Sequence, residues 1–268
     1  MKIKNSDIQK KYDNLNKNEY RVLSYTDENG EFDYDRYVEK QTIINKRKLH
    51  LNGPTELMIK QICRFVNLEF QTIKYKPQRG LCHGTRNGSE QKNFSKYLGI
   101  PVLGTDISET AHMFPNTIQW DFHDIKDEWI NNIDFIYSNS LDHSYDPIYC
   151  LRQWFKCLKP GGICILAHDR EADGNLKNNT GFQEASSDPN SNDGFQGSFH
   201  FYEKIIKIAG EMDGMTGLRY VLNTEYMFPG DALWDMEASN WGMWDYHFVI
   251  QKLSNQKREE FATKSYEK

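Results

Sequence analysis

Residues 79–88 read RGLCHGTRNG, and this stretch decides the fold of the chain. A short strand is expected to end here, in a loop with glycines at positions 80, 84 and 88. Such glycines allow a tight turn and a close approach of backbone to a ligand. The next helix is expected to begin near Ser89 and Glu90. Glycine turns between a strand and a helix are common, so the prediction depends on the later segments of the chain.

Four more short apolar runs come after this loop, and each ends at polar residues or glycine. They are VLGTD at 102–106, IQWD at 118–121, FIYSN at 135–139 and ICIL at 163–166, the last preceded by KPGG at 159–162. Segments of helix length separate the runs, which predicts successive strand–helix units of a parallel sheet. A sheet of this kind binds its ligand beyond the carboxyl ends of its strands. A glycine loop followed by acidic strand ends indicates a site for a nucleoside-bearing cofactor.

Two carboxylates lie at these strand ends. Asp106 closes the second strand, 22 residues after Gly84, and suits a two-pronged hydrogen bond to ribose hydroxyls. The alternative is that Asp106 or Ser108 caps the following helix. Asp121 closes the third strand and precedes Phe122, which offers a carboxylate for an exocyclic amine beside a ring for an adenine face. The alternative there is a surface turn.

Taken in order, these motifs resemble a class I S-adenosylmethionine (SAM)-dependent methyltransferase over about residues 75–253. The resemblance implies an α/β, Rossmann-like fold with a seven-stranded, mostly parallel sheet. Its last strand, expected at 246–253, would run antiparallel to the others. The segment SNSLDH at 138–143 resembles the motif after strand four of many small-molecule methyltransferases, in which a histidine follows shortly after the strand.

SAM is the cofactor that the resemblance implies, lying across the ends of strands one and two. Asp106 would hold the ribose, and Asp121 with Phe122 would hold the adenine. The positions that match the cofactor-binding motifs are Cys82, His83, Gly84, Thr85, Arg86, Asp106, Ile107, Asp121, Phe122, Ser138 and Asn139.

The glycine loop departs from the family pattern of Gly-x-Gly-x-Gly preceded by an acidic residue. Residues 82–86 read CHGTR, so only the central glycine, Gly84, is kept. Cys82 and Arg86 carry Cβ atoms where the backbone normally approaches the cofactor, so a different local path is expected. Either Arg86 reaches the methionyl carboxylate of SAM, or the loop is remodelled and the site inactive; the intact strand ends favour the first. Glu90 would hold Arg86 in place or be a solvated first-turn carboxylate.

A dehydrogenase shares this scaffold but requires the G-x-G-x-x-G fingerprint. The glycines at 80, 84 and 88 do not fit that spacing, and the KPGG turn has no role in that interpretation. The sequence therefore favours a methyltransferase.

Methyl transfer from a sulfonium is an in-line displacement, so the protein mainly aligns the acceptor and removes its proton where needed. His143 and Asp142 follow strand four and are the candidate catalytic groups. His143 is the better base by its usual pKa, with a structural role as the alternative. Further polar groups at the same edge raise the question of a metal; they are His123, Asp124, His168 and Asp169. Their spacing matches no compact ligand motif, so no metal site is predicted.

The absence of one motif narrows the chemical class of the expected methyl acceptor. Residues 138–141 do not read Asn-Pro-Pro-Tyr or Asp-Pro-Pro-Tyr, which cradles a planar amine in related enzymes. A hydroxyl, carboxyl or amine of a small molecule is therefore the expected acceptor. The alternative function is a catalytically inactive protein of this fold that binds a partner through its N-terminal helices.

Composition adds few constraints. The 268 residues carry a net charge of −5, so no global basic field favours nucleic acid. No apolar run approaches the length of a membrane span, and the start lacks an apolar signal segment, so a cytoplasmic protein is expected. The five cysteines show no CxxC pairing and are expected to be buried free thiols. The oligomeric state stays open.

Three parts are expected along the chain: a helical N-terminal extension over 1–70, a SAM-binding domain over 71–253 and a charged tail over 254–268. In the extension, Ser6 would cap a first helix, 34–49 would form a second, and Pro54 would lie in the first turn of a third. The polar stretch 170–197 is either a lid or disordered. Three tryptophans would line a pocket or pack near the last strands; they are Trp234, Trp241 and Trp244.

Overall fold

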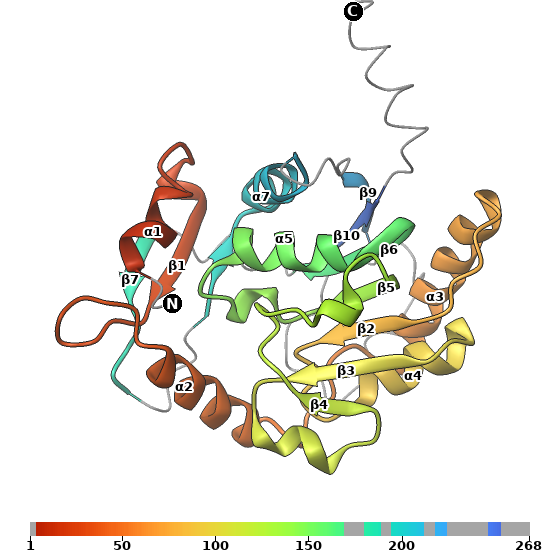
Figure 1. Cartoon of the computed structure of the whole chain (residues 1–268), viewed down its shortest axis with the longest axis horizontal. Coiled ribbons are helices and arrows are strands. Elements are labelled where there is room, and N and C mark those ends of the chain that lie inside the picture. The colour runs from red at the N-terminus through yellow and green to blue at the C-terminus, as the bar shows by residue number, and fades with distance from the viewer. Residues whose placement is uncertain (1–3, 169–179, 189–193, 212–217, 224–245, 253–268) are drawn as a thin grey trace, which may run out of the picture.

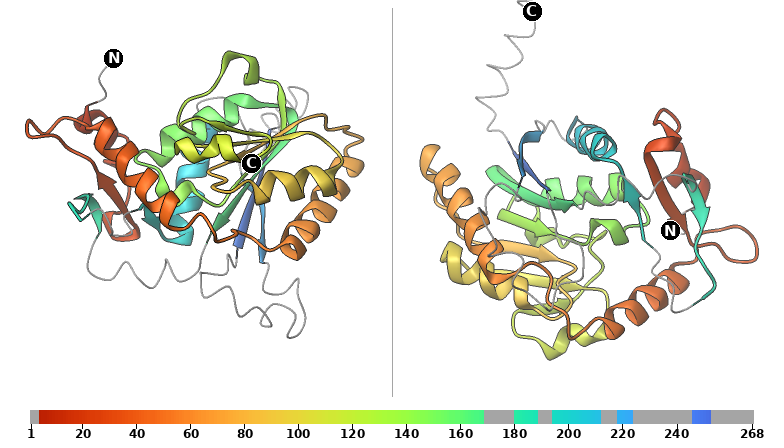
Figure 2. Two further views of the ribbon diagram at one scale, coloured as in Figure 1. Left: turned by 90° about the horizontal axis from the view of Figure 1, so that it is seen from below. Right: turned by 180° about the vertical axis from the view of Figure 1, so that it is seen from behind.

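The computed structural model describes residues 4–168, 180–188, 194–211, 218–223 and 246–252. Within them, a large sheet carries helices on both of its faces, and a small sheet stands beside it (Figures 1 and 2). This mixed α/β architecture with a mostly parallel sheet confirms the class predicted from the strand-end series.

The large sheet has the strand order β4-β3-β2-β5-β6-β10-β9. Its strands are β2 (Gly80–His83), β3 (Val102–Asp106), β4 (Thr117–Gln119), β5 (Ile133–Ser138), β6 (Leu158–His168), β9 (Leu218–Asn223) and β10 (Tyr246–Gln251). The pairs among β2 to β6 are parallel, whereas β10 is antiparallel to both β6 and β9. The antiparallel strand expected near residue 246 is therefore present.

The chain changes direction across the sheet between β2 and β5. From β2 it proceeds through β3 to β4 on one side, and it then returns to β5 and β6 on the other. Because β2 and β5 are parallel neighbours, their carboxyl ends open side by side. This topological switch point is where open α/β sheets bind ligands.

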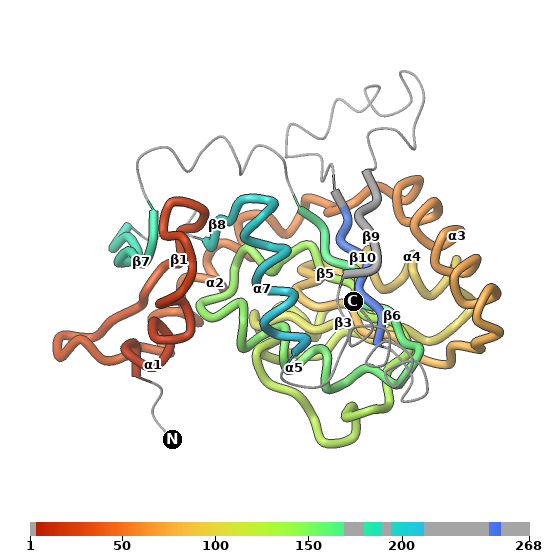
Figure 3. Tube along the Cα trace, turned by 90° about the horizontal axis from the view of Figure 1, so that it is seen from above, coloured from red at the N-terminus to blue at the C-terminus, as the bar shows by residue number. Residues whose placement is uncertain are grey.

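Each face of the large sheet is covered by its own helices. On one face, α3 (Glu56–Thr72) and α4 (Ser89–Leu98) share an apolar core with Ile163 and Ile165 of β6. On the other face, α5 (Pro147–Cys157) and α7 (Phe199–Glu211) pack against Cys164 and Leu166, and α5 and α7 lie side by side (Figure 3). Consecutive residues of β6 thus serve opposite cores, as the two-residue period of a strand requires.

Some predicted boundaries are wrong by a few residues. Helix α1 (Asn5–Lys10) follows an N-cap at Lys4, so Ser6 lies inside the helix. Thr55 caps α3 by accepting a 3.1 Å hydrogen bond from the Met58 N–H, which places Pro54 before the cap. The third strand ends at Gln119, two residues before Asp121. β6 already begins at Leu158, so the KPGG segment is the irregular start of the strand, with φ of +92° at Gly161.

The N-terminal region is not purely helical. Strand β1 (Tyr20–Ser24) pairs parallel with β7 (Gly181–Glu184) and antiparallel with β8 (Gln196–Gly197). Both partners come from the stretch 170–197, whose described part therefore includes two strands. Helix α2 (Tyr34–Arg47) leads from this small sheet toward the large one (Figure 1). Its N-cap is Asp33, which accepts a 3.0 Å hydrogen bond from the Arg36 N–H.

Short 3₁₀ turns complete the described chain. They are η1 (Lys17–Glu19), η2 (Glu109–Met113), η3 (Asp127–Trp129) and η4 (Leu141–His143). All five cysteines are buried free thiols, as expected. Within the described ranges, no helix combines the length and the apolar character needed to cross a membrane. The tail 254–268 and the three tryptophans lie outside the described residues.

Candidate functional site

A cleft opens at the carboxyl edge of the large sheet. It has a volume of about 1250 Å³ and lies between residues 48–56, the first turns of α4 and residues 139–143. A smaller cavity of about 50 Å³ adjoins it beneath α2. Arg86, Ser140 and His143 line both spaces, so the two spaces are neighbours that share part of their walls.

The glycine loop forms the floor of this site. Gly84 has φ of +73°, and a Cβ atom there would overlap the Cβ of Ser140. Its N–H donates a 2.8 Å hydrogen bond to the Thr105 carbonyl, which fixes the loop to β3. Both the backbone conformation and the lack of space therefore require glycine at this position.

Arg86 has a backbone conformation that glycine favours, with φ of +50°. A left-handed conformation costs a residue with a Cβ atom about 1 kcal/mol. Two hydrogen bonds hold the residue: its N–H donates to Asp106 Oδ2 at 2.8 Å, and its guanidinium donates to the Leu51 carbonyl at 3.3 Å. The arginine thus joins the glycine loop both to the end of β3 and to the loop before α3.

Asp106 lies at the end of β3 and is 5% exposed. It accepts hydrogen bonds from the Arg86 N–H at 2.8 Å, the Ser108 N–H at 2.9 Å and the Asn45 amide at 2.8 Å. Burial raises the pKa of Asp106, and the two backbone donors oppose that effect. Ser108 caps η2 through the Thr110 N–H, so the cap that was the alternative role of Asp106 falls to Ser108.

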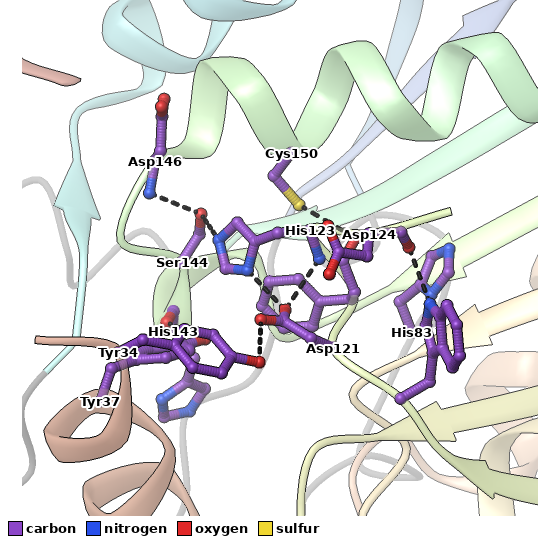
Figure 4. A network of polar contacts seen from close by, with 12 residues as sticks. Tyr34, Tyr37, His83, Asp121, His123, Asp124, His143, Ser144, Asp146 and Cys150 are labelled. Atoms are coloured by element: carbon purple, nitrogen blue, oxygen red, sulfur yellow. Dashed lines mark hydrogen bonds and ion pairs between the residues drawn. The ribbon is translucent and has the colours of Figure 1, made fainter. Parts of the chain in front are cut away.

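Asp121 stands at the next strand end and is held by His123, which the sequence indicated only as a polar residue at the rim (Figure 4). It accepts from the His123 N–H at 2.9 Å and the Tyr34 hydroxyl at 3.0 Å, and His123 Nδ1 lies 2.7 Å from it. Burial alone would raise the pKa of Asp121, but the charge and the hydrogen bonds of His123 outweigh it, so the pKa lies below its usual value.

His123 is fully buried and is itself fixed on three sides. Its Nε2 lies 2.7 Å from the Ser144 hydroxyl, and its ring stacks on Tyr145 with 3.8 Å between centroids. The spacing Asp-x-His was the sequence signal for this support. Phe122 lines the smaller cavity together with Gly84, Ile107 and both carboxylates.

The end of β5 completes the floor. The Ser138 hydroxyl donates to the His83 carbonyl at 2.9 Å and accepts from the Ser140 N–H at 3.0 Å, so it ties β5 to β2. Ser138 is buried and lines neither space, whereas Asn139 lines the cleft. Of the two, Asn139 is the residue placed to contact a ligand.

Like Ser138, three more of the predicted cofactor residues do not turn their side chains into the site. Cys82 lies in the apolar core under α3 and α4, where burial raises the pKa of its thiol. His83 faces the opposite core, stacks on Trp154 at 4.7 Å and has its pKa lowered by burial to about 3. The Thr85 hydroxyl is buried and lines neither space. Strand alternation points the side chains of Cys82 and His83 into the two cores, so any contact of these two residues with a cofactor would come from their backbone.

Both candidate catalytic groups line the cleft. His143 has 25% of its side chain exposed and Asp142 has 52%, and the nearest nitrogen and oxygen atoms are 3.9 Å apart. His143 Nδ1 is buried and has no hydrogen-bond partner among the described residues. The structure therefore brings the two residues together at the mouth of the site, with His143 closer to the smaller cavity.

Residues of α2 also line the site or hold its carboxylates, and the sequence did not single them out individually. Tyr34 and Asn45 hydrogen-bond to Asp121 and Asp106, and Tyr37 lines the smaller cavity. No local sequence signal identifies them, because their partners lie 61 to 87 residues away.

No metal centre is evident in the described part of the chain, where no group of three or more His, Cys, Asp or Glu side chains is placed to hold an ion. His168 packs against Tyr202 of α7, with 4.4 Å between ring centroids. Asp169 lies outside the described residues.

Comparison with known proteins places the fold. No protein-family model matches the chain, and no curated protein matches its sequence. The structure is similar to the plantazolicin methyltransferase BpumL in complex with a pentazolic desmethylPZN analogue and SAH. That match has a TM-score of 0.54 and 13% identity, and it covers 82% of this chain and 98% of the other. A complex of the same enzyme with a triazolic analogue gives a TM-score of 0.54 at 14% identity and the same coverage.

A weaker match is a Galdieria sulphuraria protein crystallised as a candidate sarcosine dimethylglycine methyltransferase. Its TM-score is 0.40 at 17% identity, and the match covers 57% of this chain and 60% of the other. The assignment of the fold therefore depends on the BpumL structures and on the strand order. Together these show that the chain has the fold of the class I SAM-dependent methyltransferases.

Proposed function

We propose that the chain is a SAM-dependent methyltransferase acting on a hydroxyl, carboxyl or amine of a small-molecule acceptor. The observation that carries the proposal is that Asp106, Asp121, Phe122 and Gly84 line one cavity at the switch point of the sheet. These residues supply two carboxylates, an aromatic ring and a glycine-sized approach, which is what an adenosine moiety requires. SAH bound to BpumL, a protein of the same fold, supports SAM as the cofactor.

Each part of the cofactor has a matching group. Asp106 would accept hydrogen bonds from the ribose hydroxyls. Asp121 would accept a hydrogen bond from the exocyclic amine of adenine, beside the Phe122 ring. Arg86 lines both spaces, so its guanidinium can reach a methionyl carboxylate in the cleft. SAM would supply an electrophilic methyl group directed into the cleft.

Helix α2 would have to move when the cofactor binds. The smaller cavity holds only about 50 Å³, and Asn45 and Tyr34 already hydrogen-bond to the two carboxylates. On Asp121 an adenine amine would replace the Tyr34 donor, and on Asp106 two ribose hydroxyls would replace the single Asn45 donor, so neither carboxylate would lose a hydrogen bond. We therefore expect α2 to shift when the cofactor binds.

The acceptor would lie in the larger cleft. There the chain aligns it with the methyl group, and His143 or Asp142 receives its proton where the acceptor has one to lose. Since His143 borders both spaces, it is the better placed of the two.

Calorimetric titration with SAM and with SAH tests the proposed function. We expect one-to-one binding of both ligands with dissociation constants in the micromolar range. Absence of binding at millimolar ligand would contradict the proposal and would favour a protein of this fold that serves only as a binding partner.

Substituting Arg86 by glycine should weaken SAM and SAH binding about tenfold, because a charge-assisted contact contributes about 1.5 kcal/mol. The melting temperature should change little, because glycine adopts the φ of +50° without strain and this gain offsets the lost hydrogen bond from the guanidinium to the Leu51 carbonyl. Calorimetry and thermal unfolding together check both expectations. Lys92→Ala, at another cation that lines the cleft, is the control and should bind SAH normally. An Arg86→Gly affinity equal to the wild type would mean that Arg86 points away from the methionyl carboxylate.

A further inference from the structure

Glu90 is a buried acid near the proposed site, and none of the contacts proposed above for SAM involves it. It lies in the first turn of α4, is 3% exposed, and its Oε2 has no hydrogen-bond partner among the described residues. Burial raises the pKa of Glu90 to about 8. An unsatisfied carboxyl oxygen in a protein interior is costly, and such groups concentrate at functional sites.

The carboxyl group of Glu90 lies directly behind the wall of the cleft. Gly53 and Asn139 line that wall, and a Cβ atom at Gly53 would be 2.5 Å from Glu90 Oε1. A side chain at position 53 would therefore press on this carboxyl group. The interaction of the Asn139 amide with Glu90 favours the charged form and lowers its pKa.

Other carboxylates of the site already have their partners. Asp106 and Asp121 each take three hydrogen bonds, and Asp142 is half exposed. The loop 79–88 contains no acidic residue, so Glu90 provides the first carboxyl group after it. Among the described carboxylates of the site, Glu90 is thus the buried one with an oxygen to spare.

Arg86 provides a positive charge near the acidic side chain of Glu90. It precedes Glu90 by four residues and is close enough to lower the pKa of the Glu90 carboxyl. A cation that lines the cleft and an acid directly behind its wall match a ligand group that carries a carboxylate and an ammonium on one carbon atom. The methionyl end of SAM is such a group.

We propose that Glu90 binds the ammonium group of the methionyl end of SAM, while Arg86 binds its carboxylate. This assignment rests on the proposed function. It gives the unpartnered oxygen of Glu90 a hydrogen-bond donor, which the described residues do not supply.

Binding of the methionyl end should depend on pH. An ammonium group favours the ionised carboxylate, so binding should drive a proton from Glu90 near neutral pH, and affinity should rise with pH up to about 8. The charged and titratable groups facing Glu90 are Arg86 from the loop, Asp106 from β3, Cys82 from β2 and Tyr137 from β5. Burial raises the pKa of the Cys82 thiol and the Tyr137 hydroxyl, so both stay neutral over this range.

The test compares two ligands and three proteins. SAH carries the methionyl ammonium and carboxylate, whereas 5′-methylthioadenosine keeps the adenosine and lacks both. Glu90→Gln should weaken SAH at least about tenfold and leave 5′-methylthioadenosine within about twofold of the wild type. Glu56→Gln, at an exposed acid that lines the same cleft, should change neither affinity.

Equal effects of Glu90→Gln on the two ligands, or no effect on SAH, would overturn the assignment. A wild-type protein that binds neither ligand would overturn the proposed function, and this assignment with it.

Two further measurements separate binding from folding. The raised pKa means that Glu90 destabilises the ligand-free fold increasingly as pH rises from its usual 4.5 to about 8, so Glu90→Gln should melt at a higher temperature than the wild type at about pH 8. Titrations of the wild type near pH 7, in buffers of different ionisation heat, need no variant. They should show release of nearly one proton with SAH and none with 5′-methylthioadenosine, and equal proton release with both would overturn the assignment.

Discussion

Replacing Asp106 by alanine should abolish SAH binding, with a loss of at least about 100-fold. The carboxylate would accept two ribose hydroxyls, and hydrogen bonds to a charged group contribute about 1.5–3 kcal/mol each. The two backbone donors that now bond to Asp106 would also lose their acceptor, so the loop at Arg86 would no longer be held to the end of β3.

Calorimetry with SAH measures this loss, and thermal unfolding shows that the variant is folded. Asp124→Asn serves as a control, because Asp124 lies close to Asp121 but lines neither space. An Asp106→Ala protein that binds SAH within about threefold of the wild type would show that the ribose is held elsewhere.

Replacing His123 by leucine should lower the free energy of unfolding by about 3 kcal/mol. The imidazole is fully buried and bridges Asp121 and Ser144, so its removal leaves a buried carboxylate and a hydroxyl without their partner. Breaking a buried charged pair from one side typically costs about 3–5 kcal/mol. Asp121, the proposed hydrogen-bond acceptor for the adenine amine, also loses the imidazole that orients it, so SAH should bind more weakly.

The effect on stability should depend on pH in a defined direction. Because His123 holds the pKa of Asp121 below its usual 3.8, the stabilisation is present at neutral pH and is lost as pH falls through the folded pKa. The difference between wild type and His123→Leu should therefore be largest near neutral pH and should narrow below about 4. Denaturant unfolding across this range measures it.

His112→Leu is the matched control, since His112 lies in η2 and is exposed. It should unfold within about 0.5 kcal/mol of the wild type, as surface substitutions do. The same small difference for His123→Leu would show that the Asp121–His123–Ser144 chain does not support the site.

The strand-end series was predictable because local pattern encodes it. Short apolar runs that stop at glycine or acidic residues fix the strands of a parallel sheet, and the sheet's own geometry then gathers their ends. Asp106, Asp121, Phe122 and Gly84 consequently line one cavity, although Gly84 and Asp121 are 37 residues apart in sequence. The antiparallel strand near residue 246 was expected from the family resemblance alone, and β10 confirms it.

The features that the sequence did not reveal depend on contacts between distant segments. The partners of β1 lie 160 to 177 residues later in the chain, and no local period marks such a pairing. Tyr34 and Asn45 have the polarity of ordinary surface residues on a helix, yet both reach into the site. The burial of Glu90 also depends on tertiary packing. An acid in the first turn of a helix is usually solvated, but the packing of α4 against the sheet buries this one.

Cys82 and His83 show the limit of matching residues to a motif. Their positions in the loop correspond to cofactor contacts of the family, but β2 extends through both and directs one side chain into each core. Only after the strand ends, from Gly84 onward, does the chain turn toward the ligand space. At Cys82 and His83, any contact with the cofactor would have to come from the backbone instead of the side chain.

A crystal structure of the SAH complex tests the central claim most directly. We expect ribose hydroxyls hydrogen-bonded to Asp106, the adenine amine on Asp121, and the methionyl end between Arg86 and Glu90, with Asn45 and Tyr34 displaced from the two carboxylates. SAH bound away from the ends of β2 and β3, with Asn45 and Tyr34 still hydrogen-bonded to Asp106 and Asp121, would contradict it.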